Sequence, residues 1–201
     1  MRDAILSLIA FILSVTVHEF GHAWVATRLG DSLPRAQNRL TLNPIHHIDP
    51  VGTLLAPLLM SAMGGAGFAW GRPVSTNPSS FTRRFTRSTG SMLVSLAGPA
   101  MNLLLATLIS LMIVVGMRTG VMGVDVAELL ITYMVALNLS LMFFNLLPIP
   151  PLDGGSLLAW VLPRSMQGVV DVLARWGFLI LLGLMVTGML RFVMLPARRF
   201  M

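Results

Sequence analysis

Three residues near the N-terminus, His18, Glu19 and His22, have the types and the spacing of a hydrolytic metal site. Residues four apart lie on the same face of a helix, so both imidazoles can bind one ion. The carboxylate of Glu19 stands next to the first ligand and can take a proton from a water molecule on that ion. Zinc suits two imidazoles and a carboxylate with one position left for water. The pattern therefore predicts a hydrolase with one zinc ion per chain.

The motif lies in an apolar part of the chain. Residues 4–17 carry no charge, and apolar character resumes from Ala23 to Ala26. Because about 20 residues span the core of a bilayer as a helix, residues 4–26 predict a spanning helix. No small-residue cleavage site precedes the motif, so we expect this helix to be retained. A charge inside such a helix costs about 2.5–3.5 kcal/mol, which favours a functional site over an interfacial cluster.

The site needs a third ligand, and the chain has no Cys to supply it. Five acids stand in links or at the ends of apolar runs and are expected to be solvated: Asp3, Asp31, Asp125, Glu128 and Asp171. Asp49 is expected to cap the segment that begins at Pro50. Asp153 follows a proline-rich break and precedes Gly154 and Gly155, which let the backbone approach a ligand or another helix. Asp153 could equally start the next helix as its cap, but the need for a third ligand favours it as that ligand.

The composition indicates that most of the surface of this protein faces lipid. Apolar residues make up 55% of the sequence and charged residues only 11%, far less charge than a soluble surface needs. All 14 basic residues are Arg, and they stand between apolar runs, where membrane topology places them. No basic run is interleaved with aromatic residues, so we expect no nucleic-acid partner.

The apolar runs predict an all-α integral membrane protein. Clear spans are expected at residues 4–26, 92–117, 129–147 and 176–195. Residues 51–70 carry no charge but contain Pro57 and several Gly, so they form either a further span or a re-entrant element buried against protein. We expect a polytopic bundle of four to six transmembrane helices in a single membrane-embedded domain over residues 1–201, without a separate soluble domain. The basic loop at residues 72–87 is expected in the cytoplasm.

Several separate motifs resemble those of the site-2 protease family of intramembrane metalloproteases, in its short form without a PDZ domain. They are His18–His22, Asn43–Thr53, Phe68–Val74, Ala97–Asn102 and Asn145–Gly154, although Trp70 and Gly71 stand in the opposite order to the family's. The resemblance implies a three-helix core that binds zinc through His18, His22 and Asp153. It also implies cleavage of transmembrane protein or peptide substrates within the bilayer, and the short form favours the plasma membrane of a bacterium or archaeon.

Two asparagines and two histidines have alternative interpretations. Asn102 could donate a hydrogen bond to the oxyanion or join two helices, and its motif match favours the catalytic role. Asn145 is expected to satisfy backbone groups freed by the prolines. His46 and His47 are adjacent and cannot easily bind one ion, so we expect them at the interface.

A second hypothesis is a membrane metal-binding or transport protein that uses the same His and Asp residues without hydrolysis. Glu19 separates the two hypotheses, because a transporter gains nothing obvious from a non-ligand base beside the first histidine. The sequence shows no inverted repeat that would favour transport. It allows a homo-oligomer and leaves the oligomeric state open.

Overall fold

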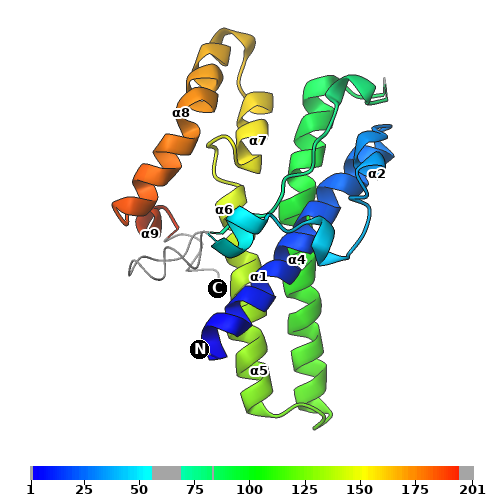
Figure 1. Ribbon diagram of the computed structural model, residues 1–201, viewed down its shortest axis with the longest axis vertical. Coiled ribbons are helices and arrows are strands. Elements are labelled where there is room, and N and C mark those ends of the chain that lie inside the picture. Colours follow the sequence, from blue (N-terminus) through cyan, green and yellow to red (C-terminus); the bar gives the residue numbers. More distant parts are fainter. Residues whose placement is uncertain (1, 56–68, 83, 195–201) are drawn as a thin grey trace.

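The computed structural model describes residues 2–55, 69–82 and 84–194, which contain helices and no strand (Figure 1). The longer helices are α1 (Arg2–Arg28), α4 (Arg87–Arg118), α5 (Val124–Leu130), α6 (Ala136–Asn145), α7 (Asp153–Val161) and α8 (Gln167–Val186). Short elements join them: α2 (Leu33–Ala36), η1 (Pro44–His46), η2 (Pro50–Leu55), η3 (Pro78–Ser80), η4 (Ile131–Val135), η5 (Arg164–Met166) and α9 (Leu190–Val193). The all-α prediction is confirmed.

Within the described residues, four helical stretches are long and apolar enough to cross a membrane: Arg2–Arg28, Arg87–Arg118, Val124–Asn145 and Arg164–Val186. The first three match the predicted spans closely. The fourth was predicted at residues 176–195, and this placement is wrong, because only residues 176–186 of the prediction lie in the observed span. Asp171 and Arg175 do not bound the helix but lie exposed within it, and Thr187 closes its last turn through a bond to Gly183 O.

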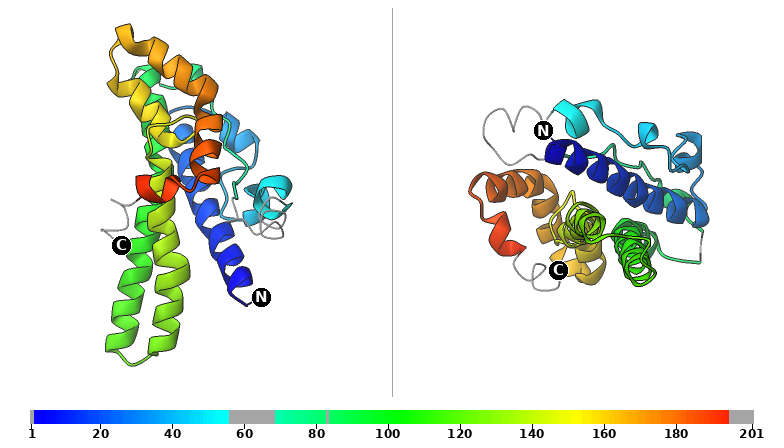
Figure 2. Two further views of the ribbon diagram at one scale, coloured as in Figure 1. Left: turned by 90° about the vertical axis from the view of Figure 1, so that its left-hand side faces the viewer. Right: turned by 90° about the horizontal axis from the view of Figure 1, so that it is seen from below.

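The core is formed by three paths of chain. Helix α1 packs along α4, and the continuous path of α5, η4 and α6 packs against α4 and also contacts α1 (Figures 1 and 2). Small side chains at Ala10, Ala23 and Ala26 are almost completely buried in α1, which allows close helix contact. By contrast, Leu104, Leu108 and other large apolar residues of α4 are exposed, as expected for helix faces that meet lipid.

The connection between α1 and α4 folds back on itself. Trp70 N donates to Gly52 O at 3.1 Å, and Arg72 N donates to His47 O at 2.9 Å, so the two described flanks of the apolar stretch 51–70 lie together. Whether that stretch crosses the membrane concerns residues 56–68, which lie outside the described residues. As predicted, Asp49 caps the following segment, because its Oδ1 accepts from Val51 N and Gly52 N.

Asp31 differs from the sequence prediction. It is 2% exposed instead of solvated, and its two carboxylate oxygens accept hydrogen bonds from Leu33 N and Asn77 N at 3.0 and 2.6 Å. A buried carboxylate is stable where backbone donors satisfy it. Asp31 therefore joins the chain after α1 to the chain before α4 and helps to hold the connection against the bundle.

Candidate metal centre

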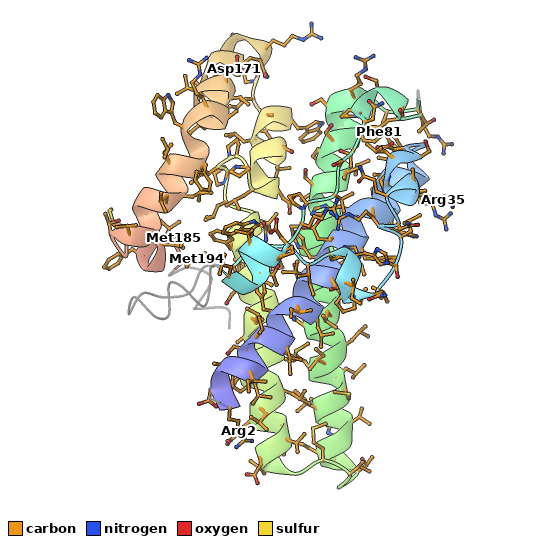
Figure 3. All side chains as sticks on the ribbon, viewed as in Figure 1. Arg2, Arg35, Phe81, Asp171, Met185 and Met194 are labelled. Atoms are coloured by element: carbon orange, nitrogen blue, oxygen red, sulfur yellow. The ribbon has the colours of Figure 1, made fainter. Side chains whose placement is uncertain are left out.

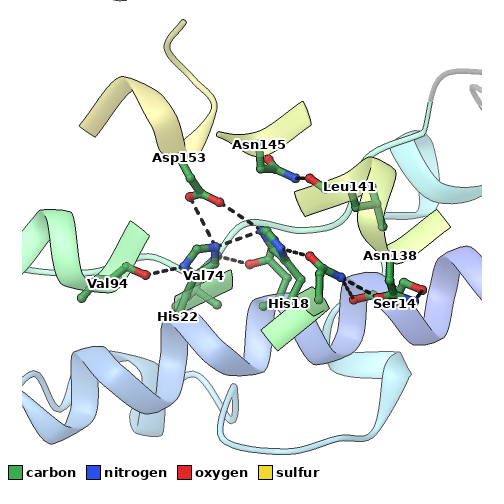
Figure 4. Close-up of polar contacts among 11 residues, drawn as sticks. Ser14, His18, His22, Val74, Val94, Asn138, Leu141, Asn145 and Asp153 are labelled. Carbon is green, nitrogen blue, oxygen red and sulfur yellow. Dashed lines mark hydrogen bonds and ion pairs between the residues drawn. The ribbon is translucent and has the colours of Figure 1, made fainter. Parts of the chain in front are cut away.

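The structure brings together His18, His22 and Asp153, the three predicted metal ligands (Figure 4). The two Nε2 atoms lie 3.1 Å apart. Asp153 Oδ2 lies 3.2 Å from His18 Nε2, and Asp153 Oδ1 lies 3.4 Å from His22 Nε2. The histidines come from adjacent turns of α1, as their spacing requires, and Asp153 is the first residue of α7. No other group of three or more such residues is found in the described part of the chain.

Hydrogen bonds to the other ring nitrogens aim both Nε2 atoms at the centre of this group. His18 Nδ1 lies 2.6 Å from Asn102 Oδ1, and His22 Nδ1 lies 2.7 Å from Val94 O. These oxygens only accept, so each Nδ1 carries the hydrogen, and each Nε2 of a neutral ring presents its lone pair.

The converging atoms fit a cation. Two lone pairs and a carboxylate at these distances repel one another unless a positive charge lies between them. Asp153 Oδ2 is buried and has no hydrogen-bond partner among the described residues, which is costly unless an ion satisfies it. Two imidazole nitrogens and one carboxylate oxygen are a donor set that zinc accepts with one position left open.

The loop between α6 and α7 places Asp153. Pro148, Pro150 and Pro151 end the helical path, and the chain resumes as a helix only at Asp153. A Cβ atom at Gly154 would overlap the carbonyl groups of Leu146 and Leu147, so a larger residue could not follow the ligand at this close approach. The sequence interpretation that Gly154 lets the backbone approach its surroundings is thus confirmed.

Glu19 lies in the wall of a cavity of about 650 Å³ that also exposes His18, His22 and Asp153. Its Oε2 accepts a hydrogen bond from Val74 N at 3.0 Å, which fixes the carboxylate beside the ligand group without making it part of that group. Most of the remaining wall is apolar. It comes from α1, α6 and α8, with Phe11, Phe144 and Phe178 among its residues, and from the segment 69–76 before α4, which contributes Trp70 and Pro73.

Asn102 has contacts that favour a positioning role over the predicted oxyanion role. Its side chain is fully buried and is not part of the cavity wall. Its Nδ2 donates to Ser14 O at 3.3 Å and to Asn138 Oδ1 at 2.8 Å, and these bonds leave Oδ1 to face His18. Asn138 Nδ2 donates in turn to Met134 O and Ser14 Oγ. Because backbone carbonyls can only accept, they fix which end of each amide donates, from Asn138 through Asn102 to His18.

Asn102→Ala is expected to weaken zinc binding by about 10- to 100-fold, the usual cost of losing a partner behind a metal ligand. The ring of His18 loses its acceptor, and Asn138 Oδ1 loses its donor. Competition with a chromophoric chelator measures the affinity. The control is Ser110→Ala in the same helix, whose hydroxyl bonds only to Ala106 O. Equal affinity of Asn102→Ala and wild type would contradict the positioning role.

The other predicted polar residues lie away from the ligand group. Asn145 lines the cavity, and its Nδ2 bonds to Leu141 O at 2.9 Å, which satisfies a backbone carbonyl near the end of α6. His47 is buried instead of interfacial, and its Nε2 bonds to Thr41 O at 2.8 Å. Burial lowers the pKa of His47, so its ring is neutral at pH 7. Asn138 belongs to no motif or periodic pattern that could have marked it in the sequence, although an intramembrane amide is itself unusual.

Comparison with known proteins finds zinc metalloproteases among the relatives of this chain. The profile of peptidase family M50 matches residues 112–184. "Putative zinc metalloprotease YwhC" of Bacillus subtilis (strain 168) is 38% identical over 195 residues, which cover 94% of this chain and 84% of the relative. "Putative zinc metalloprotease Rip2" of Mycolicibacterium smegmatis is 35% identical over 187 residues, covering 91% and 67% respectively.

No solved structure matches this chain. The resemblance to site-2 proteases and the choice of zinc are confirmed by the relatives, whose similarity extends over almost the whole sequence. The chain is a short, multi-pass membrane protein of peptidase family M50, the site-2 protease family of zinc metalloproteases.

Proposed function

We propose that this protein is an intramembrane zinc endopeptidase that hydrolyses peptide bonds in or near transmembrane segments of other membrane proteins. The observation that supports it most is the position of the His18, His22 and Asp153 group. This group faces an apolar cavity between helices that are long enough to span a membrane, and Glu19 lies in the same wall.

His18, His22 and Asp153 would hold the zinc ion. When bound, zinc supplies a Lewis acid and lowers the pKa of a water molecule towards neutrality. The three side chains are already gathered by helix packing, and the hydrogen bonds to Asn102 and Val94 fix the rings. The protein therefore loses little conformational freedom when the ion binds.

Glu19 is proposed as the general base. Its carboxylate is held at the cavity wall by the N–H of Val74, next to the proposed ligand His18. There it can take a proton from the attacking water and later return it to the leaving amine, a role that contributes typically 10²- to 10⁴-fold to a rate. Catalytic Asn102 is not part of this proposal, because its amide is occupied by His18, Ser14 and Asn138.

The cavity suits an apolar segment whose backbone is locally unwound. Side chains such as Phe144, Phe178 and Met185 offer apolar contacts and exclude water around the reacting bond. A peptide bond inside a helix is shielded by its own hydrogen bonds, so the substrate has to unwind before water can attack. We therefore expect Gly or Pro in the substrate segment to promote cleavage.

The distribution of Arg residues supports an orientation in the membrane. Arg28 ends α1, Arg87 begins α4, and the connection between them carries further Arg residues. Arg35 lies toward this end of the molecule, and Arg2 lies toward the other (Figure 3). By the positive-inside rule, the connection is cytoplasmic and the N-terminus faces the outside.

We place the chain in the plasma membrane of a bacterium, as a single membrane-embedded domain over residues 1–201. A homo-oligomer stays a prediction. The alternative of a metal-binding or transport protein is less well supported, since Glu19 borders the cavity but stands outside the ligand group.

The test is cleavage of transmembrane peptides by the purified full chain, reconstituted in lipid, with products located by mass spectrometry. We expect cuts within or beside the apolar segment. Treatment with 1,10-phenanthroline should abolish them, and one equivalent of zinc should restore them. Zinc binding without cleavage of any peptide in a broad panel would favour the metal-binding alternative. Cuts confined to soluble loops would contradict intramembrane hydrolysis.

A further inference from the structure

Arg39 is a buried cation in the connection between α1 and α4. Arg39 is 2% exposed, and its guanidinium donates hydrogen bonds to three backbone carbonyls. Nη1 donates to His46 O, and Nη2 donates to Arg72 O at 2.8 Å and to Pro73 O at 2.6 Å. A single side chain thus joins two distant parts of the connection.

The burial of the Arg39 charge costs free energy of folding, which suggests that the charge or its hydrogen bonds have a function. Among the described residues, no carboxylate forms an ion pair with Arg39. Burying an ion costs several kcal/mol, which the carbonyl partners and the nearby carboxylate of Glu19 offset only in part. Burial lowers the pKa of Arg39, but an arginine side chain remains charged. A neutral residue could fill this space without the desolvation cost.

The two neighbouring carbonyls belong to a segment without regular secondary structure. Trp70 N bonds to Gly52 O and Arg72 N bonds to His47 O, so the segment is paired up to residue 72. Pro73 has no N–H, so the pairing cannot continue through it. Instead, the guanidinium of Arg39 donates hydrogen bonds to the carbonyl oxygens of residues 72 and 73 and so fixes the backbone there.

The segment reaches the proposed base immediately after this clamp. Val74, the residue after Pro73, donates its N–H to Glu19 Oε2 at 3.0 Å. The position of that donor depends on the backbone at Arg72 and Pro73. From these contacts we propose that Arg39 is a positioning residue for Glu19, which acts through the backbone of residues 72–74. The inference rests on the proposed function and deepens it.

The planar fork of arginine is suited to this clamp. Its two terminal nitrogens lie at fixed angles and reach several acceptors at once, whereas a lysine ammonium is a compact charge on a flexible stem. Arg39→Lys therefore keeps the charge near Glu19 but loses the clamp, and Arg39→Met loses both. The clamp requires that both variants behave alike.

The experiment compares wild type, Arg39→Lys and Arg39→Met in three measurements: zinc affinity, amide hydrogen exchange of residues 70–76, and peptide cleavage. We expect zinc affinity within about twofold of wild type and exchange about tenfold faster. We expect kcat to fall by about 10²-fold, the scale of a small misplacement of a catalytic group, with KM changed much less. Arg35→Met is the matched control, because Arg35 is exposed on the neighbouring α2.

Val74→Pro tests the last link of the chain of contacts. It removes the donor to Glu19, so we expect the same fall in kcat. The double variant with Arg39→Met should be no slower than either single variant. Three results would overturn the proposal. They are a normal kcat in Arg39→Lys, unchanged amide exchange in Arg39→Met, and loss of zinc from either variant. Zinc affinity and exchange do not need a substrate. An inactive wild type would therefore count against the proposed function, while faster exchange would still support the clamp.

Discussion

Glu19→Gln is expected to keep its zinc and to cleave substrate about 10²- to 10⁴-fold more slowly than wild type. The amide has nearly the shape of the carboxylate, and its oxygen can still accept the hydrogen bond from Val74. It cannot take a proton at neutral pH. Zinc content by mass spectrometry and cleavage rates on one transmembrane peptide, measured on the same preparation, check the prediction.

The control for this variant is Glu128→Gln. Glu128 is an exposed acid in α5, away from the cavity wall, and loses the same charge. It should retain both zinc and activity. Wild-type rates in Glu19→Gln would show that Glu19 is not the base. Loss of zinc from Glu19→Gln would instead show that Glu19 helps to hold the ion.

Gly98→Ala is expected to weaken zinc binding, although Gly98 has no side chain that could bind the ion. Helix α4 packs so closely on α1 here that a Cβ atom at Gly98 would lie 2.6 Å from both Cε1 and Nε2 of His18, and it would also overlap His22 Nε2. Overpacking typically costs 1–3 kcal/mol, and 1.4 kcal/mol is a factor of ten in affinity. Because the displaced atoms are the ligand atoms, we expect zinc affinity to fall by about 10²-fold and cleavage to fall with it.

Gly183→Ala is the matched control for the added methyl group. Gly183 lies inside α8, and apart from its own helix backbone and chain neighbours no described residue has an atom within 4 Å of a Cβ placed there. This variant should bind zinc as wild type does, since Ala favours the helix more than Gly. Chelator competition measures both affinities. Normal affinity in Gly98→Ala would mean that α1 and α4 separate without cost, which would contradict the close packing described here.

Much of the fold follows from local sequence alone. An uncharged run such as residues 92–117 has few alternatives to a spanning helix, so the first three spans were predicted well. The last span was misplaced because Asp171 was expected to lie outside the helix, in a link or at the end of an apolar run. Exposed charges near the end of an apolar helix can lie in the helix itself when their side chains reach polar surroundings.

The candidate site divides in a similar way. His18 and His22 were predictable because the geometry of one helix fixes their relation, and Asp153 because few acids remained. The contacts of Asn138 and Arg39 were not predictable, since they depend on which segments meet in three dimensions. The burial of Asp31 has the same origin: its two donors, Leu33 and Asn77, are paired only by the folded connection.

The wide separation of the proposed ligands has a consequence for how the enzyme is made. His22 lies in the first helix, and Asp153 lies 131 residues later (153 − 22 = 131). At about 5–20 residues per second, a ribosome needs roughly ten seconds to cover that interval. During this time, α1 carries a base and two histidines into the membrane without the third ligand. The complete set of proposed ligands can therefore assemble only after α1, α4 and α6 have all been synthesised.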